Sequence, residues 1–437
     1  MRAHLRALAT LTLSTFVSRV GQHLLVVGDA LVVGRHSVEQ LAWLGAAAAI
    51  GSVLYVLAPG LLIGALVRTS AARARNALAE VGDIWRASVL YGLGAGAIGG
   101  LACLAGPWLL ALLGQEARVA AEGGRLLGWF GLALPVHFAM FATLYVLEAS
   151  GRARACAMTF ALAAAANIGL NMLLVFDTTA GLGADGALLA TTLVRLGILA
   201  MLAALLFRDR QAEAYGLRRW HWPAAVIWRG VCLIGFAGGA SLAGESTAFA
   251  SLTVFAGWLG AESLAAYTIL FNVLSTIFMM ALAVGVATSI QVAWAREHDP
   301  EAGPKQALWA ALTLSTALMG GFGLLAWWLA APVAGAFTED AVTAAAAAGL
   351  MGWLVVFLLA DGTQVTVHHA VRGLGDGWVT TAINLVCYLG VMTSLSWALA
   401  LPGGQGVAGL FQGGLIASAL VAGLLLWRFG RLRRRVA

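Results

Sequence analysis

The stretch GFAGGASLAGESTAFASLTVFAGWLGAES, Gly235 to Ser263, decides the fold because it is a long apolar run with Glu245 inside it. A run of this length can cross a lipid bilayer as one helix. A carboxylate at the centre of a spanning helix costs about 2.5 kcal/mol or more, so it needs a pocket, a proton or a cation. Two interpretations of Glu245 stay open: a site that couples transport to an ion, or an inert acid held by a neighbouring helix.

The whole chain has the composition of a polytopic membrane protein. Of its 437 residues, 61% are hydrophobic and 11% are charged, and the mean hydropathy is +0.88. At about 20 residues per span, the length accommodates roughly a dozen helices and leaves no room for a sizeable soluble domain. We therefore predict an all-α membrane protein with twelve transmembrane helices in two pseudo-symmetric six-helix bundles.

Apolar runs between polar breaks predict where the twelve spans lie. They fall near residues 7–33, 40–67, 85–113, 123–149, 155–177, 183–207, 226–257, 262–293, 305–335, 342–371, 377–401 and 405–430.

The basic residues indicate topology rather than a nucleic-acid partner, although the net charge is +6. With both termini in the cytoplasm, 21 Lys and Arg residues lie on the cytoplasmic side, and Arg35, Arg118 and Arg125 lie on the other. This asymmetry follows the positive-inside rule. It predicts that both termini are cytoplasmic. Arg19 and Arg195 remain inside spans, and the sequence names no partner for either.

The pattern of reactive residues favours neither an enzyme nor a cofactor protein. Its four cysteines are isolated and form no CxxC pair, so we predict no disulfide and no cysteine metal site. No GxSxG or HExxH motif is present. His368 and His369 are adjacent, so they point to different sides of a helix and make a poor metal pair.

The chain has the signature of an internal duplication. Its longest polar connection, Arg208 to His221, falls at the midpoint and predicts two six-helix lobes, residues 1–212 and 213–437. A shift of about 223 residues aligns the segment that begins at Glu39 with the one that begins at Glu262. Two parallel repeats are typical of transporters that bind substrate between their lobes.

Once the acids beside the loops are set aside, three remain within the predicted spans: Asp29, Glu245 and Asp361. Each is expected to face the bundle interior or a watery cavity. A carboxylate that binds two cations in turn couples their movements, which is the simplest logic of an antiporter. Asn167 and Asn171 are four residues apart and share one helix face. Their amides could bind a substrate or a neighbouring helix.

Several motifs resemble the multidrug and toxic compound extrusion family. GDALVVGRHSVEQLAWLGAA, Gly28 to Ala47, is similar to the family's first helix and following loop. Glu245 with the later WLGAESLAAYTILFNVLSTIFMMALAVGVATS resembles the seventh-to-eighth-helix segment. ASGRARACAM (Ala149 to Met158) and VRGLGDGWVT (Val371 to Thr380) look like its basic glycine loops. The resemblance covers nearly the whole chain and favours the NorM-like bacterial branch.

The resemblance implies a secondary active antiporter that exports amphipathic, often cationic, organic compounds in exchange for Na⁺ or H⁺. It matches Asp29, Glu245 and Asp361 to the family's membrane acids, which bind or couple the cation, with Na⁺ a candidate at Glu245 and Asp361. Asp29, Asn167 and Asn171 would bind substrate. The implied setting is a bacterial inner membrane, and the expected form is a monomer with no cofactor other than the coupling ion.

The sequence departs from the family in two of its helices. Ser14 and Ala237 stand where family members usually carry prolines, so bending of those helices would depend on glycines instead.

A lipid-linked sugar flippase of the same superfamily is the alternative function. The intramembrane charges, three acids against two arginines, favour a cationic substrate.

Overall fold

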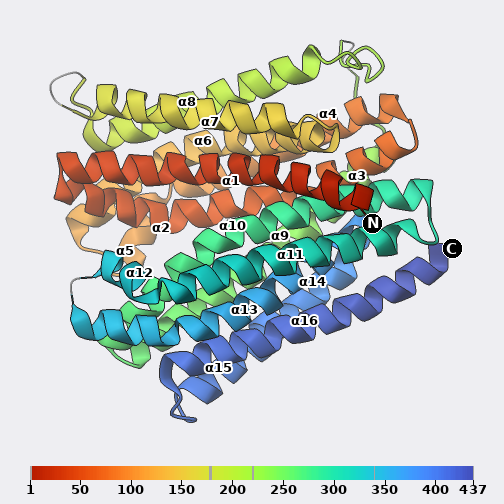
Figure 1. Cartoon of the computed structure of the whole chain (residues 1–437). Helices are drawn as coiled ribbons and strands as arrows, with labels where there is room; N and C mark the ends of the chain where they lie inside the picture. Colours follow the sequence, from red (N-terminus) through yellow and green to blue (C-terminus); the bar gives the residue numbers. More distant parts are fainter. Residues whose placement is uncertain (1, 177–179, 219–220, 339, 437) are drawn as a thin grey trace. The chain divides into compact units, whose positions relative to one another are not determined.

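Helices make up nearly all of the chain. The computed structural model describes residues 2–176, 180–218, 221–338 and 340–436 (Figure 1). The helices, with one π-helical segment, are α1 (Arg2–His36), α2 (Val38–Leu61), α3 (Ile63–Ala74), α4 (Leu78–Cys103), α5 (Gly106–Leu112), α6 (Ala117–Ala149), α7 (Ala153–Val175), α8 (Gly183–Phe207), α9 (Ala225–Trp258), α10 (Ala261–His298), α11 (Gly303–Trp328), α12 (Ala330–Phe337), α13 (Ala341–Gly373), α14 (Trp378–Leu385), η1 (Val386–Met392), α15 (Thr393–Ala400) and α16 (Gly406–Val436).

The prediction of twelve membrane-spanning segments is confirmed. In the described part of the chain, eleven helical segments are long and apolar enough to cross a membrane, and α4 and α5, counted together as one bent span, make twelve. These two helices meet at a bend of 60°. Pro107 lies at the start of α5. Because proline has no backbone N–H to donate and its ring crowds the preceding turn, Pro107 favours the bend between α4 and α5.

Two compact units make up the molecule. The N-terminal unit is Val17–Gly239, and the C-terminal unit combines Met1–Phe16 with Ala240–Ala437. These units differ in two places from the division predicted between residues 212 and 213. Residues 1–16 group with the C-terminal unit, and residues 213–239 group with the N-terminal unit. The reason is packing: Leu8 of α1 is fully buried in an apolar cluster with Ala287 and Ala310 of the C-terminal unit. The polar connection marks the middle of the chain, whereas side-chain contacts decide the units.

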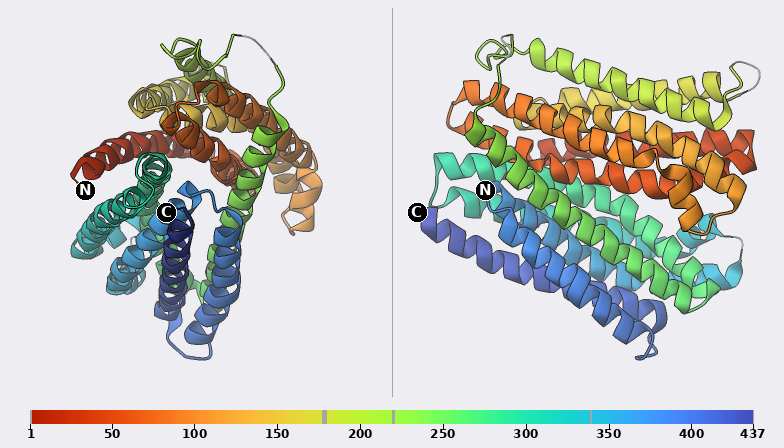
Figure 2. Two further views of the ribbon diagram at one scale, coloured as in Figure 1. Left: turned by 90° about the vertical axis from the view of Figure 1, so that its right-hand side faces the viewer. Right: turned by 180° about the vertical axis from the view of Figure 1, so that it is seen from behind.

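Each unit is built around one deeply buried helix. In the N-terminal unit α6 packs against α2, α4, α5 and α8, and every residue from His137 to Ala149 is buried. In the C-terminal unit α13 packs against α10, α11, α12 and α16, and every residue from Gln364 to Gly373 is buried. The C-terminal part of each helix is therefore buried all round and forms the core of its bundle at that end. Figure 2 shows α16 returning antiparallel along α15 after a short turn.

The internal duplication is visible in the helix lengths. The core helices α6 and α13 both have 33 residues, and their first residues are 224 positions apart. The helices α4 and α11 both have 26 residues, and each is followed by a short helix, α5 or α12. The two halves therefore repeat one six-span pattern at the offset that the sequence predicts.

Within the N-terminal unit, α2 and α9 approach closely at glycines. A Cβ atom at Gly60 would lie 2.8 Å from the carbonyl oxygen of Gly238 and 3.0 Å from the Cα of Gly239. The first distance is shorter than real Cβ contacts allow and the second is unusually tight, so no larger residue fits at this crossing without a shift of the backbone. Small residues permit this kind of backbone contact between membrane helices.

Candidate cation-binding clusters

The carboxylate of Asp29 is the centre of a polar cluster in the N-terminal unit. Asp29 of α1 is 5% exposed, and Asn167 and Asn171 of α7 are fully buried. The Nδ2 of Asn171 donates to Asp29 Oδ1 at 2.8 Å, and the Nδ2 of Asn167 lies 3.4 Å from the same oxygen. The structure therefore brings together these three residues from the sequence prediction.

Thr191 of α8 completes this cluster. Its hydroxyl oxygen lies 2.7 Å from Oδ1 and 2.6 Å from Oδ2 of Asp29, so it can donate to either. The same hydroxyl accepts a 2.8 Å hydrogen bond from Asn167 Nδ2. The cluster thus joins α1, α7 and α8 through neutral donors, which stabilise a carboxylate without cancelling its charge.

One acceptor of this cluster is left over. The Oδ1 of Asn171 is buried and has no hydrogen-bond partner among the described residues. Buried polar atoms are almost always paired, so an orphaned oxygen beside a carboxylate is a specific feature. Carboxylate, amide and hydroxyl oxygens are the ligands that hard cations prefer. The oxygen atoms around Asp29 therefore form a set of ligands that fits a small cation or a proton.

The buried Arg195 has partners that the sequence did not name. Its Nη1 donates to the hydroxyl oxygen of Tyr55 at 2.6 Å, and its guanidinium carbon lies 4.1 Å from the centre of the same ring. The ring of His137 is 4.6 Å from that of Tyr55. Arg195 is therefore held by hydrogen bonding and by a cation–π contact.

A second cluster surrounds Asp361 in the C-terminal unit. Asp361 of α13 is 1% exposed. The hydroxyl of Tyr388 in η1 donates to Asp361 Oδ1 at 3.1 Å, and the hydroxyl of Ser418 in α16 donates at 3.4 Å. The two hydroxyls are also 3.1 Å apart. Tyr388 lies in a π-helical segment, an irregularity that is common at functional sites.

Glu245 of α9 is held less firmly. Its side chain is partly buried, and its Oε2 accepts a long hydrogen bond of 3.5 Å from Asn384 Nδ2. The same amide nitrogen donates to the hydroxyl of Ser241 at 3.0 Å. Glu245 is therefore the most accessible of the three acids.

Asn384 of α14 is the node of the polar network around Glu245. Its Oδ1 accepts from Gln364 Nε2 at 3.3 Å and lies 3.3 Å from His368 Nδ1. The Oε1 of Gln364 is buried without a hydrogen-bond partner among the described residues. As in the other unit, an orphaned amide oxygen lies in the network that contains an acid.

The oxygens of these clusters would have to supply any metal ligands. In the part of the chain that the structure describes, no group of three His, Cys, Asp or Glu side chains could hold a metal ion. The two clusters themselves offer hydroxyl, amide and carboxylate oxygens, which are ligands for hard cations.

Glu148, which was set aside as an acid beside a loop, is a further buried acid of the helices, so the count of three was too low. Glu148 is 1% exposed in the last turn of α6, and its Oε2 lies 3.4 Å from Arg19 Nη2 of α1. The guanidinium carbon of Arg19 also lies 5.4 Å from the ring centre of Phe141. Because Glu148 stands two residues before a glycine loop, its position in the chain resembles that of a loop acid.

Other residues of the clusters could be recognised only in three dimensions. Thr191, Tyr388 and Ser418 are ordinary polar residues in apolar helices. Asn384 carried a usable signal, because asparagine occurs at only five positions in the chain. Three of the five belong to the acid clusters.

The family follows from the comparison with known proteins. Residues 15–173 and 239–398 match the family model MatE, one match in each half of the chain. The chain belongs to the MatE family. The MatE matches cover both acid clusters except for Thr191 and Ser418.

Relatives of this MatE protein match over nearly its full length. "Probable multidrug resistance protein NorM" of Caulobacter vibrioides is 34% identical over 424 residues, which cover 95% of this chain and 89% of the relative. The protein of the same name from Aromatoleum aromaticum is 27% identical and covers 94% of this chain and 90% of the relative.

Solved MATE structures have the same fold as this MatE chain. A crystal structure of MATE in the bent conformation matches with a TM-score of 0.90 at 19% identity, over 99% of this chain and 98% of that one. A eukaryotic MATE transporter matches with a TM-score of 0.86 at 18% identity, over 100% and 99%. The predicted fold class and the family resemblance are both confirmed.

Proposed function

We propose that the protein is a secondary active multidrug efflux antiporter that exports amphipathic, cationic organic compounds in exchange for Na⁺ or H⁺. One observation carries the proposal: the acids Asp29, Asp361 and Glu245 accept their hydrogen bonds from neutral hydroxyl and amide groups. A carboxylate inside the membrane whose hydrogen-bond partners are neutral has no countercharge from them, so binding a cation or a proton relieves the cost of its charge. The names of the relatives, multidrug resistance proteins, agree with this function.

We assign the three acids to two tasks. Glu245 and Asp361 bind the coupling cation in the C-terminal unit. Asp29, with Asn167 and Asn171, binds substrate or cation in the N-terminal unit. Exchange at the acids couples the two flows, because a site occupied by one cation releases the other.

A cationic substrate suits the buried arginines better than an anionic lipid-linked sugar does. Arg19 is engaged by Glu148, and Arg195 is engaged by Tyr55. Both arginines therefore have partners within the N-terminal unit. The flippase alternative would need basic groups directed at its cargo.

We place the protein in a bacterial inner membrane, in keeping with its bacterial relatives, and we propose that it acts as a monomer. The distribution of Lys and Arg supports cytoplasmic termini.

Reconstituted vesicles test the function. Substrate-driven cation counterflow is measured with a Na⁺ gradient and a pH gradient imposed separately. Glu245→Gln and Asp361→Asn should abolish counterflow, whereas Glu262→Gln, a matched change of an exposed acid at the start of α10, should retain it. Unfolding temperatures establish that the variants are folded. Full ion-coupled transport by Glu245→Gln and Asp361→Asn would refute the assignment.

A further inference from the structure

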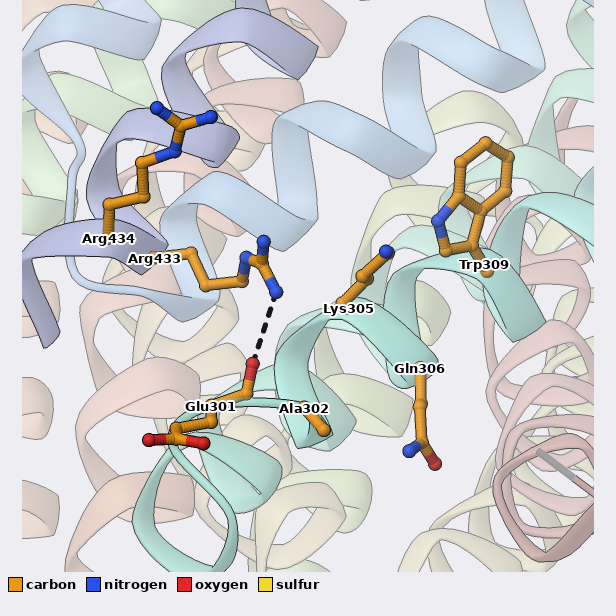
Figure 3. Close-up of a pocket in the computed structure, with 7 residues that line it drawn as sticks. All are labelled: Glu301, Ala302, Lys305, Gln306, Trp309, Arg433 and Arg434. Atoms are coloured by element: carbon orange, nitrogen blue, oxygen red, sulfur yellow. Dashed lines mark hydrogen bonds between the residues drawn. The ribbon is translucent and has the colours of Figure 1, made fainter. Parts of the chain in front are cut away.

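A surface cavity lies at one end of the C-terminal unit. None of the residues that line it belongs to the acid clusters. Its volume is about 670 Å³, and it is formed where the α10–α11 connection meets the last turns of α16 (Figure 3). Its lining residues are Glu301, Ala302, Lys305, Gln306, Trp309, Arg433 and Arg434. No part of the proposed transport function uses this cavity.

The lining of the cavity is predominantly cationic. Lys305, Arg433 and Arg434 contribute three positive charges, and Glu301 contributes the single carboxylate. The Nη1 of Arg433 donates to the backbone oxygen of Glu301 at 3.1 Å, the contact drawn in Figure 3. Lys305 and Arg434 are exposed at the surface. The excess positive charge and the open mouth suit an anionic ligand that approaches from outside.

An exposed stripe on α16 leads into this cavity. The residues Leu420, Leu424, Trp427, Arg431 and Arg434 follow each other at intervals of four and three, so they lie on one helix face. All five are exposed, with Leu420 at 41% and Trp427 at 55%. The stripe is therefore apolar along the span and cationic at its end.

The order of residues along the stripe is that of a membrane–water boundary. Tryptophan is typical of the interface, and arginine there extends its charge toward the headgroups. The guanidinium carbon of Arg431 lies 3.9 Å from the ring centre of Trp427. Trp309, which lines the cavity from α11, is 54% exposed. The cavity thus lies where phospholipid headgroups meet the protein.

We propose that this cavity is a binding site for an anionic phospholipid. The headgroup phosphate lies against Lys305 and Arg434, and an acyl chain follows Leu424 and Leu420 along α16. Basic pockets between membrane helices bind anionic headgroups in this way. A soluble phosphate compound would use the cations but not the apolar stripe. The bound lipid links the end of α16 to the α10–α11 connection.

Native mass spectrometry of the purified full-length protein tests the site. Phosphatidylglycerol and phosphatidylcholine with identical acyl chains are titrated separately. Phosphatidylglycerol should bind more tightly, and the double variant Lys305→Gln/Arg434→Gln should weaken its binding by about tenfold or more, since each cation near the surface contributes on the order of 1 kcal/mol. Glu301→Gln should strengthen binding, because it removes the opposing carboxylate.

Two further variants make the test specific. Arg208→Gln/Arg210→Gln removes the same charge from exposed arginines after α8 and should leave the affinity for phosphatidylglycerol unchanged. Leu424→Ser should weaken binding of the lipid. Equal losses in both double variants, or equal binding of the two lipids, would overturn the proposal. Displacement of the lipid by glycerol phosphate at comparable concentrations would also overturn it, because the ligand would then be a soluble phosphate compound.

Discussion

Asn384 and Tyr388 stand four residues apart and donate to different acids of the C-terminal unit. Asn384 lies 3.5 Å from Glu245, and Tyr388 lies 3.1 Å from Asp361. Residues at this spacing lie on one side of a helix, about one turn apart. The segment from α14 into η1 therefore connects the two acids through neutral donors. A change at Asn384 or Tyr388 should affect cation binding at the acid to which that residue donates.

Asn384→Leu should weaken coupling without removing an acid. The change removes the donor to Glu245 and Ser241, so counterflow should need a severalfold higher cation concentration for half-maximal rate. Loss of buried hydrogen bonds should also cost about 1–3 kcal/mol of stability. Thr363→Val is the matched control, because the Thr363 hydroxyl donates to the carbonyl of Leu359 in its own helix. Unchanged cation dependence in Asn384→Leu would remove Asn384 from the site.

Thr191→Val should disturb the cluster around Asp29, whereas Thr192→Val should not. The hydroxyl of Thr191 contacts both oxygens of Asp29, but that of Thr192 bonds the carbonyl of Leu188 in its own helix at 2.7 Å. Substrate affinity, measured by binding to purified protein, should fall severalfold in Thr191→Val. Equal affinities of the two variants would show that Thr191 does not matter for binding.

Breaking the Arg19–Glu148 pair should destabilise the N-terminal unit. The two side chains are 7% and 0% exposed. Because Arg19→Met or Glu148→Leu alone leaves an uncompensated buried charge, each should cost about 3–5 kcal/mol. Thermal unfolding in detergent measures the loss.

The double variant Arg19→Met/Glu148→Leu should recover most of that stability, since replacing a buried pair by apolar residues is often neutral. If the two single losses simply add in the double variant, the residues do not act as a pair.

Gly60→Ala should destabilise the contact between α2 and α9. The added methyl group would meet backbone atoms of Gly238 and Gly239, which cannot move aside as a flexible side chain can. Overpacking of this kind costs about 1–3 kcal/mol. Gly45→Ala in the same helix meets no atom within 4 Å and should be neutral or slightly stabilising. The unfolding temperatures of the two variants are compared. Equal temperatures would show that the crossing of α2 and α9 does not require glycine at position 60.

The ion pair Arg152–Asp209 outside the spans should make stability depend on pH. Partial burial raises the pKa of the Asp209 carboxyl, but hydrogen bonds from the Gln211 backbone and Arg152 outweigh it and hold the pKa below its ordinary value of 3.8. The stabilisation is present above the ordinary value and is lost as the pH falls through the folded value. Since Arg152 is 45% exposed, the pair contributes less than about 1 kcal/mol.

Asp209→Asn should therefore lower the unfolding temperature slightly at pH 7 and have no effect once the carboxyl is protonated. Glu213→Gln, an exposed acid in the same connection, is the control. A decrease in unfolding temperature of the same size at pH 7 and at a pH where the Asp209 carboxyl is protonated would contradict the ion-pair explanation.

Much of the fold could be predicted because the bilayer imposes simple rules. Each crossing needs a long apolar run, so the spans, their number and the repeat are legible in one dimension. The units could not be predicted. Met1–Phe16 groups with the C-terminal unit because Leu8 packs there, and no local pattern specifies which helix will cover a given apolar side chain.

The candidate site was predictable in its acids but not in its donors. Asp29, Glu245 and Asp361 are conspicuous because charge is costly in lipid. Thr191 and Tyr388 are not conspicuous, since hydroxyls occur throughout the spans and most of them bond their own helix. Glu148 was missed because its position in the chain, beside a polar loop, gives no sign of its burial.

The sequence by itself determined that the chain crosses a membrane twelve times, that its halves repeat and that a few acids must remain in apolar surroundings. Hydrophobic length and the cost of charge in lipid decide these features, and both depend on residue order alone. Only the tertiary structure decided which neutral groups meet each carboxylate and that Arg19 pairs with Glu148. The partners come from separate helices, and helix packing brings residues together that are far apart in the chain.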